Sequence, residues 1–333
     1  MAKRKKAKTK NNTKALTYIA WTLAIIALVL SSLVAGYYFG YEDGKVQNSK
    51  QVKIEKQKRL ALFKKLERKE KKQETVTKRL QAVLKQETKK DYVSASHEFD
   101  SSTVAQPIQP LKRAIKRSSN KPKLAIIIDD VTTARQIKAI KSVGIVLTMS
   151  FLPPSSARPN SAKLAAKEPF YMVHLPMEAQ SFSAEEPHTL RITDSQQKIS
   201  QRIQQIKKWF PKVHYINNHT GSKFTSNEIA MNRLIFALNK NHINFIDSRT
   251  TAQTKAPKVM KNFGLRYVAR DVFLDHHMDK AYVLKQIKQA IKQAKLHGTA
   301  IAIGHPHPNT LLALFESKKL FKDVELVYIN RLY

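Results

Sequence analysis

At residues 124–130 the chain reads Leu-Ala-Ile-Ile-Ile-Asp-Asp, five apolar residues followed by two carboxylates. A short apolar run without alternation is typical of a strand that is buried on both faces of a parallel sheet. Further apolar runs follow toward the C-terminus, at residues 145–152, 170–173, 213–216, 245–246, 266–274, 299–303 and 324–329. The sequence therefore predicts a series of buried strands that belong to one sheet.

Patterns with helical period lie between these runs. Residues 196–210 place isoleucines on one face behind Asp194, which we expect to cap the helix, and residues 279–296 show the same period before Gly298. Strands that alternate with helices predict an α/β fold with helices on the sheet. We expect a (β/α) barrel, complete or incomplete, with an open doubly wound sheet as the alternative.

The N-terminal region has the composition of a membrane anchor. Residues 15–41 contain no charged side chain, seven basic residues precede them, and Glu42 and Asp43 follow. The run is long enough to cross a hydrocarbon core of about 30 Å. The charge asymmetry predicts a single-pass helix in the cytoplasmic (inner) membrane, with residues 1–14 as a basic cytoplasmic tail and the main domain outside, in the periplasm. A cleaved signal peptide is the alternative, but its apolar region is usually only about 7 to 15 residues long.

The region that follows the anchor is polar and basic. Residues 42–90 are rich in Lys, Gln and Glu, with a narrow apolar stripe that includes Val76, Leu80 and Val83. This pattern predicts a helical stalk, which either self-associates as a coiled coil or is a single solvated helix. Residues 91–120 gain Ser and Pro, the composition of a linker, and a folded domain is expected at residues 121–333.

The composition limits the chemistry. The chain of 333 residues has 60 Lys and Arg against 25 Asp and Glu, a formal net charge of +35. This excess suits anionic lipid or an acidic polymer. Nucleic acid is not an expected partner, because no recognisable nucleic-acid-binding module is present. The chain has no cysteine, which excludes disulfides, thiol nucleophiles and Cys-ligated metals, so any metal must be held by His and carboxylates.

Side chains that can ligate a metal or transfer a proton follow five of the apolar runs. They are Asp129 and Asp130, His174, residues 217–219, residues 247–249, and residues 305–307. The carboxyl ends of parallel strands meet at one edge of a sheet, so we expect these groups to converge. One Asp with two His gives a three-ligand site that leaves a coordination position open, as a catalytic zinc or a similar divalent ion requires. The other carboxylate is then available as a general base.

Six spaced motifs carry a family resemblance. In order they are Ile-Ile-Ile-Asp-Asp at 126–130, His-Leu-Pro-Met-Glu at 174–178, Asn-Asn-His-Thr-Gly-Ser-Lys-Phe-Thr at 217–225, Phe-Ile-Asp-Ser-Arg-Thr-Thr at 245–251, Arg-Asp-Val-Phe-Leu-Asp at 270–275 and Gly-His-Pro-His-Pro at 304–308. Together they resemble the divergent polysaccharide deacetylase family, relatives of the NodB-type carbohydrate deacetylases. The resemblance covers about residues 121 to 331. It implies a deformed (β/α) barrel and the metal-dependent removal of acetyl groups from N-acetylated sugars, and with the predicted anchor the expected substrate is an N-acetylated envelope polysaccharide.

The resemblance also implies roles for individual residues. Asp129 corresponds to the general base and Asp130 to the metal-binding carboxylate, while His219 corresponds to the first histidine of a metal-binding His-x-x-x-His pair. Lys223 stands where the second histidine is expected, and a protonated ammonium group cannot ligate a metal. We expect His174 to supply the missing imidazole, on the basis of its residue type and its place after a strand.

The late motifs add a proton donor and a set of supporting residues. The resemblance implies that His305 is the general acid that protonates the leaving amine, which leaves poorly without a proton. Asp247, Arg249, Arg270 and Asp275 are expected to contact the substrate or to support the site. An arginine among them has three interpretations: it pairs with Asp129, it binds an anionic group of a glycan, or it forms a salt bridge at the rim.

Three classes of function remain open on the sequence. The leading hypothesis is a membrane-anchored, metal-dependent hydrolase of amide bonds in an envelope glycan. The second is a deacetylase-fold protein that has lost hydrolysis and binds glycan or scaffolds an envelope partner. The third is a basic envelope protein that mainly engages acidic polymer or lipid, which only the net charge supports.

Overall fold

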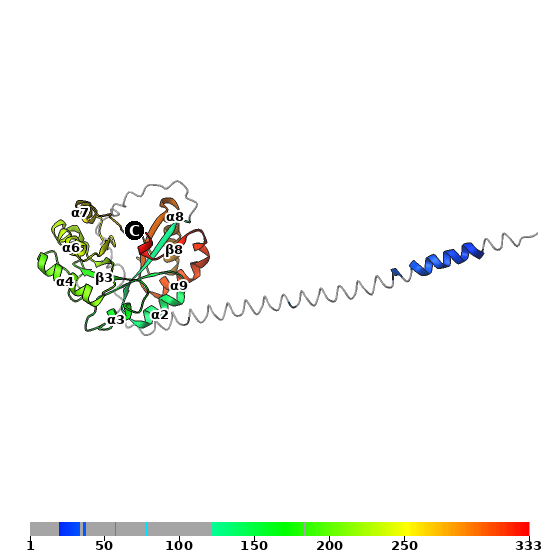
Figure 1. Cartoon of the computed structure of the whole chain (residues 1–333), viewed down its shortest axis with the longest axis horizontal. Helices are drawn as coiled ribbons and strands as arrows, with labels where there is room; N and C mark the ends of the chain where they lie inside the picture. The colour runs from blue at the N-terminus through cyan, green and yellow to red at the C-terminus, as the bar shows by residue number, and fades with distance from the viewer. Residues whose placement is uncertain are drawn as a thin grey trace, which may run out of the picture. The chain divides into compact units, whose positions relative to one another are not determined.

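The computed structural model describes residues 20–33, 36–37, 57, 78, 121–182 and 184–332 (Figure 1). The chain divides into two compact units, Met1–Gln73 and Glu74–Tyr333. In the first unit, residues 20–33 are helical, and their large apolar side chains, such as Trp21 and Leu28, are exposed. Among the described residues, no helix combines the length and the apolar character needed to cross a membrane.

The predicted anchor at residues 15–41 is therefore described only in part. The predicted stalk and linker, residues 42–120, lie outside the described residues except for positions 57 and 78, which are helical. Anchor, stalk and linker stay predictions.

A parallel sheet forms the centre of the second unit. Its strands, within the described residues, are β1 (Lys123–Val131), β2 (Thr148–Phe151), β3 (Tyr171–Met177), β4 (Tyr215–Thr220), β5 (Asn244–Ile246), β6 (Val272–Phe273), β7 (Thr299–Gly304) and β8 (Glu325–Val327). The order is β5-β4-β3-β2-β1-β7-β6, and β8 pairs with β1. An isolated parallel bridge joins Asp247, just after β5, to Ala269, before β6, so segments next to the two outer strands meet. The prediction of an α/β fold is confirmed, and the sheet curls as an incomplete barrel.

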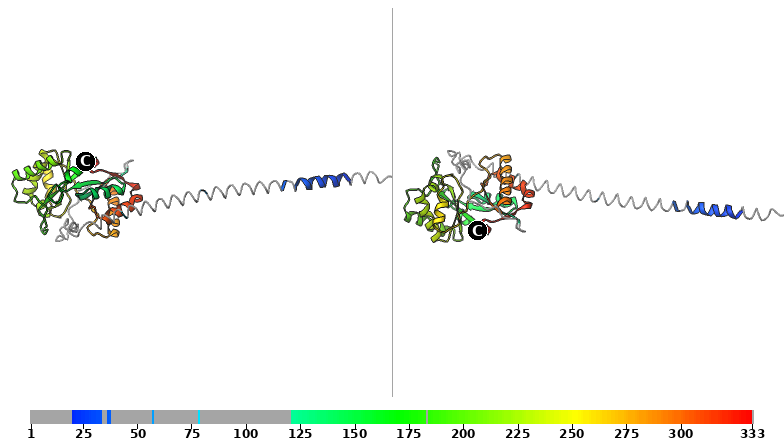
Figure 2. Two further views of the ribbon diagram at one scale, coloured as in Figure 1. Left: turned by 90° about the horizontal axis from the view of Figure 1, so that it is seen from below. Right: turned by 90° about the horizontal axis from the view of Figure 1, so that it is seen from above.

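Helices connect the strands and surround them (Figure 2). They are α2 (Ala134–Val143), α3 (Ser161–Ala165), α4 (Gln196–Trp209), α5 (Ser222–Ser226), α6 (Glu228–Lys240), α7 (Ala256–Asn262), α8 (Lys280–His297) and α9 (Pro308–Glu316), with 3-10 turns η2 (Ser317–Asp323) and η3 (Ile329–Arg331). The predicted helix at 196–210 corresponds to α4, and that at 279–296 corresponds to α8.

The predicted N-cap of α4 is wrong by one residue. Ser195, not Asp194, has the extended backbone of a cap, and its side chain accepts a hydrogen bond from the backbone N–H of Lys198. Asp194 instead accepts a hydrogen bond from the backbone N–H of Arg191 and pairs with the ammonium group of Lys198 at 2.6 Å. Both residue types are good caps, so composition alone did not separate them.

The strand β1 is buried on both faces, as its uninterrupted apolar run predicts. Leu124, Ile126 and Ile128 belong to the core between sheet and helices, whereas Ala125 and Ile127 belong to a second core inside the curled sheet. Successive side chains of a strand point to opposite faces, which explains this division. The inner core also contains Ile329 and Leu332 from the C-terminal segment, which fill one part of the barrel interior.

Candidate functional site

The inward-facing rows of four strands end in the polar residues of the site. In β1 the inner core residues Ala125 and Ile127 are followed, at the same two-residue spacing, by Asp129. The same alternation leads from Met172 to His174 in β3, from Tyr215 to Asn217 and His219 in β4, and from Ile303 to His305 after β7. The interior of the curled sheet is thus apolar first and becomes polar toward the carboxyl ends of the strands. Polar residues from distant segments of the chain therefore meet at one site.

The apolar runs suggested that these residues follow the strands, but most of them lie within the strands. Asp129 and Asp130 lie within β1, His174 lies within β3, and Asn217 and His219 lie within β4. The backbone pairing continues beyond the apolar residues, because β3 and β4 pair in register up to Met177 and Thr220. Four of the five residues are nearly inaccessible to solvent, and Asp130 is partly exposed.

An irregularity in β1 explains how two adjacent carboxylates serve the same site. Between Ile128 and Val131 the pairing with β2 gains one residue on the β1 side, which is the pattern of a β-bulge. Within this bulge Asp130 has a φ of 55°, in the left-handed region that a non-glycine residue rarely adopts. A regular strand would point Asp129 and Asp130 to opposite faces, whereas the bulge lets both approach His174.

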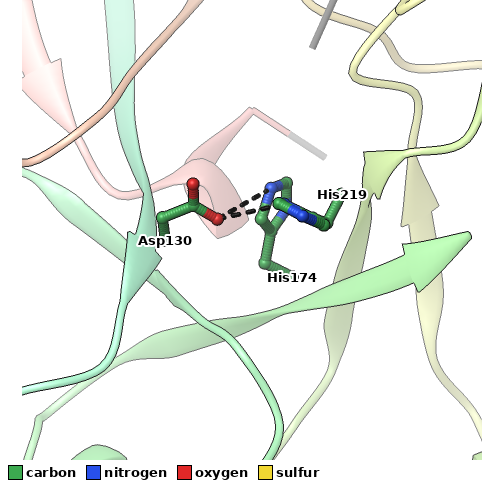
Figure 3. A group of neighbouring side chains, drawn as sticks. All are labelled: Asp130, His174 and His219. Carbon is green, nitrogen blue, oxygen red and sulfur yellow. Dashed lines mark ion pairs between the residues drawn. The ribbon is translucent and has the colours of Figure 1, made fainter. Parts of the chain in front are cut away.

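Asp130, His174 and His219 form a compact group (Figure 3). The Oδ1 atom of Asp130 lies 3.1 Å from Nδ1 of His219 and 3.6 Å from Nε2 of His174. One ligand atom from each residue lies within 4.8 Å of the other two. A carboxylate with two imidazoles is a donor set that zinc and similar divalent ions use, and the three residues fit such an ion.

The charge state of Asp130 suits this role. Burial alone would raise the pKa of its carboxyl group, but the adjacent His219 imidazole, through charge and a hydrogen bond, lowers it, and His305 and His174 add to the effect. The net result is a pKa well below the ordinary value. The carboxylate is therefore ionised at neutral pH, and a ligand must be deprotonated to bind a metal.

Asp129 is held by an amide network. The Nδ2 group of Asn217 donates a hydrogen bond to Asp129 Oδ2 at 2.8 Å, and Nδ1 of His174 lies 3.6 Å from the same oxygen. Asn217 also donates to Ser248 Oγ at 3.0 Å and accepts a bond from Ser150 Oγ at 2.7 Å. On the sequence alone, Asn217 was one of the polar residues expected at the end of a strand and had no specific task. An amide within a strand that is otherwise buried is a signal for such a network.

His305 is oriented by Asp275. Its Nδ1 lies 3.1 Å from Asp275 Oδ1, and its Nε2 lies 3.9 Å from Asp130 Oδ2. Asp275 Oδ2 accepts hydrogen bonds from the backbone N–H of His305 and from Thr310 Oγ1. Burial raises the pKa of Asp275, but the charge and hydrogen bond of His305 lower it, and the net shift is downward. An ionised Asp275 favours a ring that carries its proton at Nδ1 or at both nitrogens.

Lys223 is engaged by another acid. Its Nζ donates a hydrogen bond to Glu178 Oε1 at 2.8 Å, and the backbone carbonyl of Glu178 accepts bonds from the N–H groups of Lys223 and Phe224. Lys223 is in α5, and its side chain is 44% exposed, whereas His174 and His219 lie in the barrel interior. The group of possible ligands contains His174 in addition to His219.

The other residues expected to support the site, Asp247, Arg249 and Arg270, form hydrogen bonds that hold the backbone at the rim of the barrel. Asp247 accepts hydrogen bonds from the backbone N–H of Arg249, from Thr254 Oγ1 and from Tyr267. Arg249 donates to the carbonyl oxygen of Arg270, and Arg270 donates in return to that of Arg249. These bonds tie the segment after β5 to the segment before β6, where the isolated bridge joins the two.

Comparisons with known proteins agree with the motifs. The family described as divergent polysaccharide deacetylase matches residues 126–333. An uncharacterized protein of Haemophilus influenzae is 34% identical over 216 residues, which cover 63% of this chain and 76% of that protein. The uncharacterized protein YibQ of Escherichia coli is 36% identical over 216 residues, with 63% and 67% covered. The crystal structure of the uncharacterized protein ATU2773 from Agrobacterium tumefaciens, 19% identical, shares the fold, with a TM-score of 0.57 and coverage of 66% and 93%.

Proposed function

The chain belongs to the divergent polysaccharide deacetylase family, and we propose that it is a metal-dependent hydrolase that removes acetyl groups from an N-acetylated polysaccharide of the cell envelope. The observation that carries the proposal is the convergence of Asp130, His174 and His219 beside Asp129 and His305. Such a set contains a metal site, a base and an acid, which are the groups that hydrolysis of an amide requires.

Each residue has a defined task in this reaction. Asp130, His174 and His219 hold the ion, and a divalent ion, when bound there, would supply Lewis-acid activation of water and polarise the amide carbonyl. Asp129 accepts a proton from the attacking water, with its carboxylate held by Asn217. His305, held by Asp275, donates a proton to the nitrogen as the carbon–nitrogen bond breaks. The products are acetate and the free amine of the sugar.

The location of the chain is part of the proposal. Residues 15–41 span the inner membrane, the domain lies in the periplasm, and residues 42–90 form a stalk that sets its distance from the lipid or pairs chains. The uncharged run and the seven basic residues before it support this topology. An envelope glycan is then the N-acetylated polymer within reach of the domain.

Acetate release from a defined glycan tests the proposed reaction. Full-length protein loaded with zinc is incubated with fully N-acetylated chitohexaose and, separately, with purified peptidoglycan, and acetate is measured. We expect release from at least one of them, and we expect Asp129→Asn to lose nearly all of it while it keeps its metal. If neither releases acetate above the level of Asp129→Asn, the hydrolase proposal fails for these two glycans.

Lys223 supports a second function, that of a glycan-binding or scaffolding protein without hydrolysis. A protonated lysine cannot supply the ligand that the family motif places there. This alternative predicts that the protein cosediments with peptidoglycan and that Asp129→Asn binds it equally well, with no acetate released by either protein. Acetate release that depends on Asp129 excludes it.

A further inference from the structure

We infer that Asp275, His305 and His307 form a second divalent-metal site, and that an ion bound there inhibits the enzyme by occupying the proton donor. The inhibitory half of this inference rests on the proposed role of His305. The binding half does not depend on catalysis and is tested separately.

The three residues are brought together by neighbouring segments of the sheet. Asp275 follows β6, His305 follows β7, and His307 is the N-cap residue directly before α9. One ligand atom from each lies within 4.8 Å of the other two. Their exposed fractions are 0%, 1% and 5%, so the group is enclosed, unlike the clusters of acidic residues that are common on surfaces. One carboxylate and two imidazoles are donors that zinc or a similar borderline ion prefers.

The carboxylate of Asp275 is fixed in a geometry that suits an ion. Its Oδ2 accepts hydrogen bonds from the backbone N–H of His305 at 2.7 Å and from Thr310 Oγ1 at 2.8 Å. In metal sites of proteins, hydrogen bonds of this kind orient the residues that bind the ion. The other oxygen, Oδ1, faces His305 Nδ1 at 3.1 Å. An ion can replace the proton between these two atoms, with His307 as a third ligand.

The second site shares no residue with the group of Asp130, His174 and His219. The two sites meet at His305, whose Nδ1 faces Asp275 and whose Nε2 lies 3.9 Å from Asp130 Oδ2. An imidazolium ring carries a proton on each nitrogen. With an ion on Nδ1 the ring still holds a proton on Nε2, but donating that proton would leave an imidazolate, so the ring becomes a much weaker acid toward the leaving amine. Excess metal is therefore expected to inhibit.

A metal titration of the full-length protein tests the binding half. Metal-free protein is titrated with zinc by equilibrium dialysis, and the bound ion is counted. We expect one tight equivalent and one weaker equivalent in the natural sequence. Asp130→Asn should lose the tight one, whereas His307→Gln and His307→Phe should each lose the weaker one. His277→Gln, which changes an exposed histidine near the site, is the matched control and should keep both. Circular dichroism verifies that each variant is folded.

The inhibitory half is measured by acetate release at increasing zinc. We expect the rate to rise up to one equivalent and to fall as the second binds, and we expect His307→Gln to lose the falling phase. The inference is overturned if a folded natural protein binds no ion that depends on His307 up to millimolar zinc, or if the weaker equivalent survives in both His307 variants. A second ion that binds through His307 without slowing acetate release overturns the inhibitory half. A natural protein whose bound zinc depends on His307 but not on Asp130 would instead count against the proposed function.

Discussion

Asp129 and Asp130 are adjacent in the sequence, yet their surroundings suit them to the two different tasks that we propose. Asp130 faces His219 and His174 with one oxygen, as the proposed metal ligand must. Asp129 accepts a hydrogen bond from Asn217, which holds it next to this group for the proposed role of base. The difference arises from the left-handed conformation of Asp130 in the β1 bulge and not from residue type.

Asn217→Ala tests the support of the base. The change removes a hydrogen bond to a carboxylate, and such bonds are worth about 1.5–3 kcal/mol, so we expect the kcat of acetate release to fall by about 10-fold or more. The metal content should not change, because Asn217 is not a ligand. Asn232→Ala, in which a helix residue loses a bond to the carbonyl of Glu228, is the control and should keep its kcat. Equal kcat values for Asn217→Ala and the natural protein would contradict this role.

Lys223→Met tests whether this position takes part in metal binding. Because Lys223 pairs with Glu178, we expect zinc affinity to stay unchanged. We also expect the free energy of unfolding to fall by less than about 1 kcal/mol, since the Lys223 side chain is 44% exposed and solvent screens the pair. Isothermal titration with zinc and urea unfolding measure the two quantities. A tenfold change in zinc affinity in either direction would show that Lys223 acts on the site.

The same pair predicts a pH dependence. Burial raises the pKa of Glu178, but its hydrogen bond with Lys223, a backbone bond from Ile192 and the charges of Lys223 and Arg191 lower it below the ordinary value of 4.5. A lowered carboxyl pKa contributes stability that is present above 4.5 and is lost as the pH falls through the folded-state value. Lys223→Met should therefore lose less stability than the natural protein between pH 6 and about pH 3. Parallel losses over this range would contradict the assignment.

At the scale of elements, part of the site follows from alternation in the strands. The apolar runs and the residues that follow them predicted that Asp129, His174, His219 and His305 converge, because parallel strands deliver their inward side chains to one place. The sequence did not predict the bulge in β1, which depends on how β1 and β2 pair. Nor did it reveal the partner of Lys223, because Glu178 is 45 residues away along the chain.

The turn from β4 into α5 contains a glycine whose replacement should destabilise the domain. Gly221 caps α5 with a φ of 90°, and a Cβ atom there would lie 3.0 Å from Met177 Cβ. Gly264 has a φ of 68° with nothing within 4 Å of such an atom. Left-handed backbone costs other residues about 1–2 kcal/mol, so both Gly→Ala variants lose stability, but Gly221→Ala should lose more. Urea unfolding measures the two losses, and equal losses would show that the contact with Met177 is relieved.

At the scale of the whole molecule, composition and the apolar run predict where the chain resides. We expect that removal of residues 1–41 moves the protein from the membrane pellet to the soluble fraction, whereas removal of residues 2–14 leaves it in the pellet. Cell fractionation with immunoblotting checks both. If the protein expressed from the complete sequence is soluble and has lost its N-terminal residues, it carries a cleaved signal peptide, the alternative that the sequence left open.

The family and the α/β fold could be predicted from the sequence, because six motifs lie in order on strands and turns of one domain. The structure of the residues before position 121 could not be predicted in the same way. Their signals are compositional, a net charge and an apolar run, and composition does not specify which residues contact one another.

Zinc X-ray absorption spectroscopy tests the central claim most directly, that Asp130, His174 and His219 bind one divalent ion together. The full-length protein is loaded with one equivalent of zinc, and the spectrum is compared with those of His174→Ala and His219→Ala. We predict scattering from two imidazoles and from oxygen ligands at about 2.0–2.2 Å, with one imidazole lost in each variant. A spectrum without imidazole scattering, or one that neither variant changes, would contradict the account.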